Sequence, residues 1–379
     1  MTTKQRFIAA LENRKPDRLP VTTHNVMDYY LNKYEDGAGK AEFFEKYGMD
    51  RIDWFWPYKP DQGQYWSDTS TTGYEGIVAD DWRISSEELS DPDYRTIRYN
   101  IETPSGNLTM VIQHNEYTRW VSEHLLKNKN DLDIIARHAP RFICDIPEVE
   151  KHARDLGEQG ICRSIVPAFD IYGQPGCWQD GAILYGIEPL IMETFDDPQW
   201  VKELLGFLRD RKIHYLNSMK GAPMELLELG GGDASTTVIS PGIFQEFVAP
   251  FDSEVIAAAH KADQRIVYHT CGGMMPILED IVAMGTDAVE TLTPPGMGAD
   301  VNLAEAFRRI GDKVCFIGGF DQGQYFLKST PRETKAEVKR CFEACGLEGG
   351  YIISPSDHFF DAKPELVAAF AEAARECTY

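Results

Sequence analysis

The chain has 379 residues, 43% of them hydrophobic, and a formal net charge of −22. This hydrophobic fraction is enough for a large buried core and excludes an intrinsically disordered chain. Because such a polyanion is repelled by phosphate backbones and anionic membrane surfaces, we expect neither nucleic acid nor a membrane as its partner.

Before residue 57 the sequence predicts helices and short strands in alternation. An amphipathic helix runs from Thr3, as its N-cap, to about Asn13, and a second helix is closed by Gly48. The elements expected here are helices over 3–13 and 43–47 and apolar strands over 20–23 and 52–56.

The segment 57–130 departs from this pattern. It contains clusters of Gly, Asp and Tyr, and stretches such as 108–112 alternate in a way that is typical of hairpins rather than helices. We therefore expect an inserted, hairpin-rich segment that caps the main fold.

After residue 130, apolar runs of strand length alternate with amphipathic helical patterns. The predicted strands are 165–168, 224–229, 265–270, 288–292, 314–317 and 351–354. One helix begins at Asp197-Pro198, and another covers 331–345 and ends at Gly346.

Eight strands, most of them followed by a helix, predict an α/β fold. The expected architecture is a single (β/α)₈ TIM barrel over residues 1–379, with the insertion at about 57–130. The alternative is a doubly wound sheet, but no G-x-G-x-x-G turn follows an early strand.

Polar side chains gather where the predicted strands end. In a TIM barrel the reactive groups lie at this end, on the loops that follow the strands. The candidate site residues found there are His24, Trp54, Tyr172, Glu228, His269, Cys271, Glu290, Asp357 and His358.

The most informative fragment is His269-Thr270-Cys271-Gly272. On an extended segment, side chains two residues apart point to the same side, and imidazole and thiolate are preferred zinc ligands. Glu290 and Asp357, or His358 in its place, could complete the ligand set from neighbouring strands. The alternative is a buried histidine hydrogen-bonded to the backbone beside an inert core cysteine.

Taken together, several fragments resemble the superfamily of uroporphyrinogen decarboxylase and its methyltransferase relatives. The segments that carry the resemblance, which runs through nearly the whole chain, are 14–21 (RKPDRLPV), 238–244 (VISPGIF), 269–272 (HTCG) and 349–356 (GGYIISPS). The resemblance implies the barrel fold, whereas activity must be argued from the site.

The resemblance favours the methyltransferase branch. Uroporphyrinogen decarboxylases carry Arg-Gln-Ala-Gly-Arg-Tyr after their first strand, where this chain reads Thr-Thr-His-Asn-Val-Met-Asp. Corrinoid-dependent methyltransferases carry a zinc-binding His-x-Cys-Gly and a later cysteine. His269 and Cys271 match the pair, Glu290 matches a glutamate used by more distant relatives, and the late cysteine falls at or beside Asp357.

The resemblance thus implies a zinc enzyme that moves a methyl group from a small-molecule donor to the cobalt of a corrinoid (cobalamin) carried by a separate protein. With only one thiolate, zinc would be a harder Lewis acid, which favours a methyl ether such as a methoxylated aromatic. We expect Glu228 and His358 to be catalytic, and His24, Trp54 and Tyr172 to bind substrate.

Three alternatives remain open at this point. They are a metal-free decarboxylase or lyase of the same fold, a methylcobamide:thiol methyltransferase, and a barrel that only binds a tetrapyrrole or corrinoid.

The sequence also predicts where the protein works. Its eight cysteines are scattered, its N-terminal twenty residues carry charges throughout, and no window approaches the roughly 18 apolar residues that span a bilayer. We therefore expect a cytoplasmic enzyme with reduced thiols, and a homodimer is the default expectation for its assembly.

Overall fold

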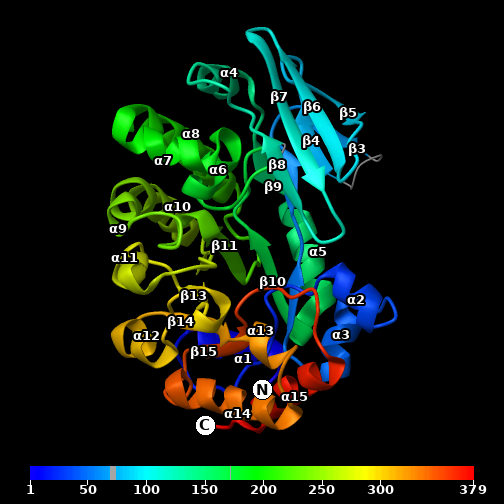
Figure 1. Cartoon of the computed structure of the whole chain (residues 1–379), viewed down its shortest axis with the longest axis vertical. Coiled ribbons are helices and arrows are strands. Elements are labelled where there is room, and N and C mark those ends of the chain that lie inside the picture. Colours follow the sequence, from blue (N-terminus) through cyan, green and yellow to red (C-terminus); the bar gives the residue numbers. More distant parts are fainter. Residues whose placement is uncertain (69–73, 171) are drawn as a thin grey trace.

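The computed structural model describes residues 1–68, 74–170 and 172–379, and its main body is a curled parallel sheet (Figure 1). The sheet has seven strands, and each one pairs with the next along the chain in parallel. In spatial order they are β1 (Arg51–Trp54), β10 (Gly160–Ile165), β11 (Leu226–Gly230), β12 (Ile266–His269), β13 (Ala288–Thr291), β14 (Cys315–Phe320) and β15 (Tyr351–Pro355).

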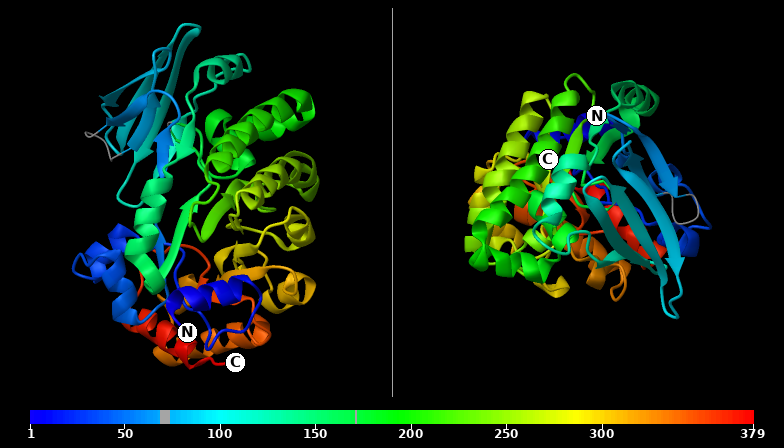
Figure 2. Two further views of the ribbon diagram at one scale, coloured as in Figure 1. Left: turned by 180° about the vertical axis from the view of Figure 1, so that it is seen from behind. Right: turned by 90° about the horizontal axis from the view of Figure 1, so that it is seen from above.

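Helices follow most of these strands and lie along the outer side of the curled sheet, as both views in Figure 2 show. After β10 they are α6 (Cys177–Tyr185), α7 (Ile187–Asp196), α8 (Pro198–Ser218), α9 (Pro241–Ile243), α10 (Ala249–Lys261), α11 (Leu278–Ala283), α12 (Leu303–Ile310), α13 (Gln322–Tyr325), α14 (Pro331–Cys345) and α15 (Pro364–Glu376). The helices before β10 are α1 (Thr3–Leu11), which packs instead on the inner apolar side of the sheet, and α2 (Asp28–Tyr34), α3 (Lys40–Tyr47), α4 (Asp131–His138) and α5 (Ile146–Leu156).

Helix ends follow the predicted capping chemistry with one shift. The first helix is capped by Thr2, not Thr3, because the Thr2 hydroxyl accepts the hydrogen bond from the backbone of Gln5. Asp197 caps α8, and α14 spans the predicted range. Gly48 closes α3 with φ 62°, a left-handed conformation that glycine adopts at little cost.

The predicted strands at 52–56, 224–229, 265–270, 288–292, 314–317 and 351–354 correspond to strands of the sheet. The strand predicted at 165–168 is wrong in position, since β10 covers Gly160–Ile165 and ends where that prediction begins. The polar residues Arg163 and Ser164 interrupt the apolar pattern of β10, and both are fully buried.

The closed barrel of eight strands is not confirmed. Residues 20–23 form only a single parallel bridge, between Val21 and Ile353 of β15. On the other side, the carbonyl of Val21 accepts a hydrogen bond from the backbone of Asp50, just before β1. This segment therefore lies between the two outer strands of the sheet without being a full strand.

Antiparallel strands fill most of the segment between β1 and α4 and form the upper end of the molecule in Figure 1. β3 (Gln64–Asp68) pairs with β4 (Tyr74–Val78), while β5 (Arg83–Leu89), β6 (Arg95–Thr103), β7 (Gly106–His114) and β8 (Arg119–Glu123) form one sheet. β2 (Tyr58–Pro60) pairs with β9 (Phe142–Cys144). That this segment caps the fold remains a prediction.

Side-chain contacts tie this antiparallel segment to neighbouring helices and to the loop after β15. The ring of Tyr117, in the β7–β8 turn, lies 4.8 Å from Tyr29 of α2 and 5.3 Å from Phe360, beyond β15. His138 of α4 bridges Ser105 and Asp81 through its two ring nitrogens, at 2.7 and 2.8 Å. The antiparallel segment is thus held at several separate points.

Asp170, in the loop after β10, is a further and buried anchor. Its carboxylate accepts hydrogen bonds from the backbone of Ile77 and the indole of Trp82, both at 2.9 Å. Burial raises the pKa of Asp170 to about 6, even though these hydrogen bonds act in the opposite direction.

This pKa predicts a pH-dependent stability. Between pH values of about 4 and 6 the folded chain keeps a proton on Asp170 that the unfolded chain has lost, so the Asp170 contribution to stability falls as pH rises through this window. Asp170→Asn is expected to remove this component, which urea unfolding of both proteins at several pH values would measure. Parallel stability curves for wild type and variant would contradict the assignment.

Within the described residues, no helix is both long enough and apolar enough to cross a membrane.

Candidate metal centre

The inner face of the curled sheet carries an apolar layer and, above it, a polar one. Side chains two residues apart on a strand share a face, and the strand register aligns these positions across the sheet. The apolar layer, which packs on Phe7, Ala10 and Leu11 of α1, includes Ile52, Ile161, Leu226, Val267, Ala288 and Ile352. Two positions further along their strands stand Trp54, Arg163, Glu228, His269 and Glu290.

Arg163 lies at the centre of the polar layer and is completely buried. Its Nη2 donates to Glu228 Oε2 at 2.6 Å and also to Glu290 Oε1. The guanidinium lies 4.3 Å from the centre of the Trp54 ring, a cation–π contact. Burial opposes its charge, but the two carboxylates outweigh burial and raise the pKa of Arg163.

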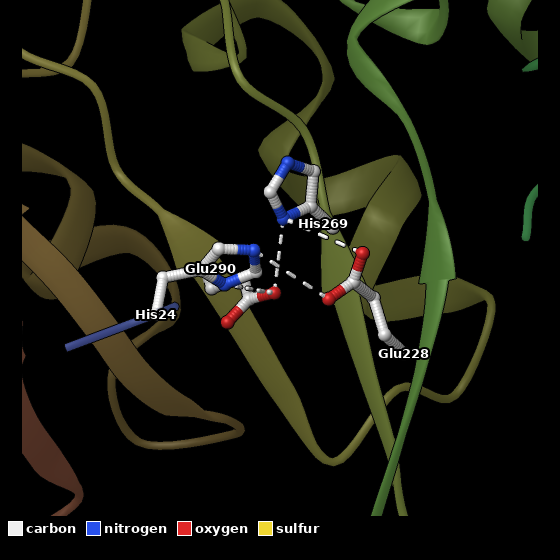
Figure 3. Close-up of side chains that lie close together, drawn as sticks. All are labelled: His24, Glu228, His269 and Glu290. Atoms are coloured by element: carbon white, nitrogen blue, oxygen red, sulfur yellow. Dashed lines mark hydrogen bonds and ion pairs between the residues drawn. The ribbon is translucent and has the colours of Figure 1, made fainter. Parts of the chain in front are cut away.

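His269 is oriented by the same carboxylates. Its Nδ1 donates to Glu290 Oε1 at 3.0 Å and lies 3.8 Å from Glu228 Oε1. Figure 3 shows that the second ring nitrogen points away from both carboxylates. Burial disfavours the imidazolium, yet the charge of Glu228 and hydrogen bonds with Cys271 and Glu290 raise the pKa of His269 well above its usual value.

His24 completes an inner group of possible ligands. Its Nδ1 lies 3.5 Å from Glu290 Oε1 and its Nε2 lies 3.9 Å from Glu228 Oε2. The His24 and His269 rings are 4.9 Å apart. We call the set His24, Glu228, His269 and Glu290 the inner group, because its ligand atoms all lie within 4.8 Å of one another (Figure 3).

A second set of possible ligands shares His269 and faces outward. The ligand atoms of His269, Cys271 and Asp357, which we call the outer group, also lie within 4.8 Å of one another. Cys271 is exposed, whereas the other seven cysteines are buried. A Cβ on Gly232 would lie 2.8 Å from the Cys271 sulfur, so this thiol needs glycine beside it.

Asp357 is held by its neighbour His358. The backbone N–H of His358 donates to Asp357 Oδ1 at 2.7 Å, and His358 Nδ1 lies 2.8 Å from the same oxygen. Burial disfavours the carboxylate, but His358 and the charges of His269 and His24 lower the pKa of Asp357. Of the two residues predicted as alternative ligands, the structure places Asp357 with His269 and Cys271.

The predicted substrate-binding residues fall in different places. The indole of Trp54 donates to the backbone carbonyl of His24 at 2.7 Å, so it supports the inner group from one side. The Tyr172 hydroxyl donates to the carbonyl of Arg119 in β8, and the Arg119 guanidinium lies over its ring. These contacts of Tyr172 are therefore with the antiparallel sheet that contains β8.

Arg163 is the residue of this centre that the sequence reading did not find. It stands in the middle of β10, one residue before the fully buried Ser164. The sequence signal for it is an arginine within a segment whose other residues suit a buried strand. A buried charge needs partners of opposite charge, so such an arginine indicates carboxylates nearby.

Comparison with known proteins places this chain in a family. The family model described as Uroporphyrinogen decarboxylase (URO-D) matches residues 177–377, more than half of the chain, and includes Glu228, His269, Cys271, Glu290 and Asp357. The chain therefore belongs to the uroporphyrinogen decarboxylase family.

Individual relatives are more distant. The uroporphyrinogen decarboxylase of Pseudoalteromonas translucida is 30% identical over 189 residues, which are 48% of this chain and 50% of that protein. The first curated relatives are thus matched over about half their length. The uroporphyrinogen decarboxylase of Alcanivorax borkumensis is 26% identical over 98% of this chain and 96% of its own length.

Among solved structures, a methyltransferase from Methanosarcina mazei shares the fold. It superimposes with a TM-score of 0.63 at 15% sequence identity, over 99% of each chain. At this identity the likeness extends to the fold alone.

Proposed function

We propose that this chain is a zinc-dependent methyltransferase of the uroporphyrinogen decarboxylase family. Its donor would be a small methylated molecule, most simply a methyl ether such as a methoxylated aromatic. Its acceptor would be the reduced corrinoid of a separate protein. The observation that carries the proposal is the outer group, in which His269, Cys271 and Asp357 bring nitrogen, sulfur and oxygen atoms within 4.8 Å of one another.

The outer group fits zinc by its chemistry. Catalytic zinc sites use three protein ligands from His, Cys and Asp or Glu and leave one position open. A tetrahedral zinc holds its ligand atoms roughly 3.3–3.8 Å apart, so small side-chain rotations would close this group around it. A zinc ion there would supply a Lewis acid that polarises the oxygen of the methyl donor.

The surrounding residues would orient the ligands. Glu290 fixes the His269 ring through Nδ1, which leaves the other nitrogen for zinc. His358 occupies Asp357 Oδ1, which leaves Oδ2. We thus propose that Glu290 and His358 position ligands instead of binding zinc. Glu228 accepts a hydrogen bond from Arg163 Nη2 at 2.6 Å, which would orient its carboxylate beside His269.

This assignment predicts different effects at Glu290 and at the ligands. Glu290→Gln keeps the shape of the side chain but weakens the hydrogen bond that orients His269. The variant is expected to bind zinc about 10–100-fold more weakly while keeping one site per chain, as isothermal titration calorimetry would show. Complete loss of the site in Glu290→Gln would instead make Glu290 a ligand.

Decarboxylation of a polycarboxylate has less support in this site. Nη2 of its central guanidinium, Arg163, is taken by Glu228 and Glu290, and its Nε and Nη1, although without hydrogen-bond partners, are buried with the rest of the side chain. Decarboxylation is favoured by the names of the curated relatives, which are uroporphyrinogen decarboxylases. Release of CO₂ is therefore measured beside methyl transfer.

We also propose that residues 20–23 stand in for the eighth strand of a closed barrel. Two backbone hydrogen bonds support this arrangement: Thr22 donates to Ile353 of β15, and the carbonyl of Val21 accepts from Asp50.

The test is methyl transfer itself. The zinc-loaded chain is mixed with a reduced corrinoid protein and a panel of methoxylated aromatics, and methyl–cobalt formation is followed by its absorption spectrum. We expect methylation with at least one donor, and none after zinc is removed by a chelator. Release of CO₂ from uroporphyrinogen by the metal-free chain, without any methyl transfer, would support the decarboxylase alternative.

A further inference from the structure

The inner and outer groups share His269, yet they differ in charge. The inner group contains the two carboxylates Glu228 and Glu290, and Arg163 lies directly between them. The outer group contains one thiol and one carboxylate. Among the described residues, the hydrogen bond and ion pair of the Asp357 side chain are both with its neighbour His358.

We propose that Arg163 is a permanent internal cation that occupies the inner group and thereby confines metal to the outer group. The inference rests on the proposed zinc site in the outer group. It explains why the inner group, although it contains two carboxylates, does not compete with the outer group for the zinc ion.

Two features keep Arg163 in place. Its side chain has no exposed surface and lies against the Trp54 ring at 4.3 Å. An arginine also keeps its proton at every pH that proteins tolerate. Unlike a lysine or histidine, it cannot make room for a metal ion by losing its charge.

Two carboxylate oxygens of the inner group already accept hydrogen bonds. Glu290 Oε1 accepts hydrogen bonds from both Arg163 Nη2 and His269 Nδ1, and Glu228 Oε2 accepts one from Arg163 Nη2 at 2.6 Å. A divalent ion bonded to either oxygen would lie within a few ångströms of the guanidinium. In a buried site the repulsion between two such cations is poorly screened.

Removing the positive charge should therefore open a second metal site. In Arg163→Met, His24, Glu228 and Glu290 would remain as three ligands of nitrogen and oxygen, a set that binds a divalent cation. No sulfur would be involved, so metal in this site can be distinguished from metal beside Cys271.

Cobalt(II) titration of the full-length chain makes the distinction. Wild type is expected to bind one cobalt ion with a sulfur-to-cobalt charge-transfer band, and that band should vanish in Cys271→Ser. Arg163→Met is expected to bind a second ion that adds ligand-field absorption without strengthening the sulfur band. The matched control is Arg211→Met, which removes another buried arginine, one that bonds the carbonyls of Ala139 and Pro140, and should still bind one ion.

The outcomes separate the two claims. If wild type binds no cobalt with a sulfur band, the proposed metal site fails. If that band is present but Arg163→Met still binds a single ion, the role of Arg163 is overturned.

A second variant keeps the test decisive if Arg163→Met does not fold. His24→Ala removes an inner-group ligand and leaves the outer group intact. It should bind one cobalt ion with an unchanged sulfur band. Loss of the ion in this variant would show that the inner group holds the metal, which would overturn the inference.

Discussion

Zinc binding is expected to be lost when either outward-facing ligand is replaced. Cys271→Ser exchanges the thiolate for a poor zinc ligand. Asp357→Asn removes a largely buried negative charge, and such a charge favours a bound cation beside it. We expect the affinity for zinc to fall by more than about 100-fold in each variant, beyond the range for loss of an orienting partner. Competition with a chromophoric chelator measures this.

The matched control is Asp361→Asn. Asp361 lies four residues after Asp357 and accepts hydrogen bonds from Lys33 and Tyr34, away from the outer group. Its replacement should leave zinc affinity unchanged. If Cys271→Ser and Asp357→Asn also bound zinc as wild type does, the outer group would not be the metal site.

Lys212→Met is expected to cause the largest loss of stability. Lys212 Nζ lies 2.7 Å from Asp180 Oδ2, and both side chains are 1% exposed. Without the ammonium, the Asp180 carboxylate stays buried with backbone hydrogen bonds alone, from Phe169 and Gln174. Such a broken buried pair costs about 3–5 kcal/mol in the free energy of unfolding, which urea denaturation would measure.

Two further variants test the cause of that loss. Lys202→Met breaks an exposed ion pair with Glu246 and should cost about 0–1 kcal/mol. The double variant Lys212→Met/Asp180→Asn removes both charges and should be more stable than Lys212→Met alone. If the double variant were instead the less stable of the two, the loss would come from packing of the Lys212 chain and not from the uncompensated charge.

Several parts of the fold could be predicted because their signals are local. Apolar runs such as 265–270 and 288–292 lie where strands form, since those residues are buried whichever neighbours they pair with. Helix ends were also readable, because Asp197 caps α8 through a hydrogen bond to a backbone N–H three residues away.

The fold could not be read where backbone pairing or burial contradicts the local pattern. Residues 20–23 form a bridge instead of a strand because their backbone hydrogen bonds to β15 are both made with one residue, Ile353. β10 was misplaced because Arg163 looks like a surface residue until Glu228 and Glu290, far away in sequence, surround it.

The candidate site shows the same division. His269 and Cys271 are two residues apart, so the sequence alone indicated that they act together. That Glu290 bonds one ring nitrogen of His269 depends on the pairing of β12 with β13. The position of Tyr172 against Arg119 depends on how β8 lies against the loop after β10, a long-range arrangement that no local pattern indicates.

The most direct test of the account is the metal content of the chain. The protein is purified without added metal, incubated with zinc, freed of excess, and analysed for bound zinc per chain beside Cys271→Ser. We predict one zinc ion per wild-type chain and almost none in the variant. Wild-type protein that retains no zinc after this treatment would contradict the central claim, and metal-free chemistry in this fold would then have to be considered.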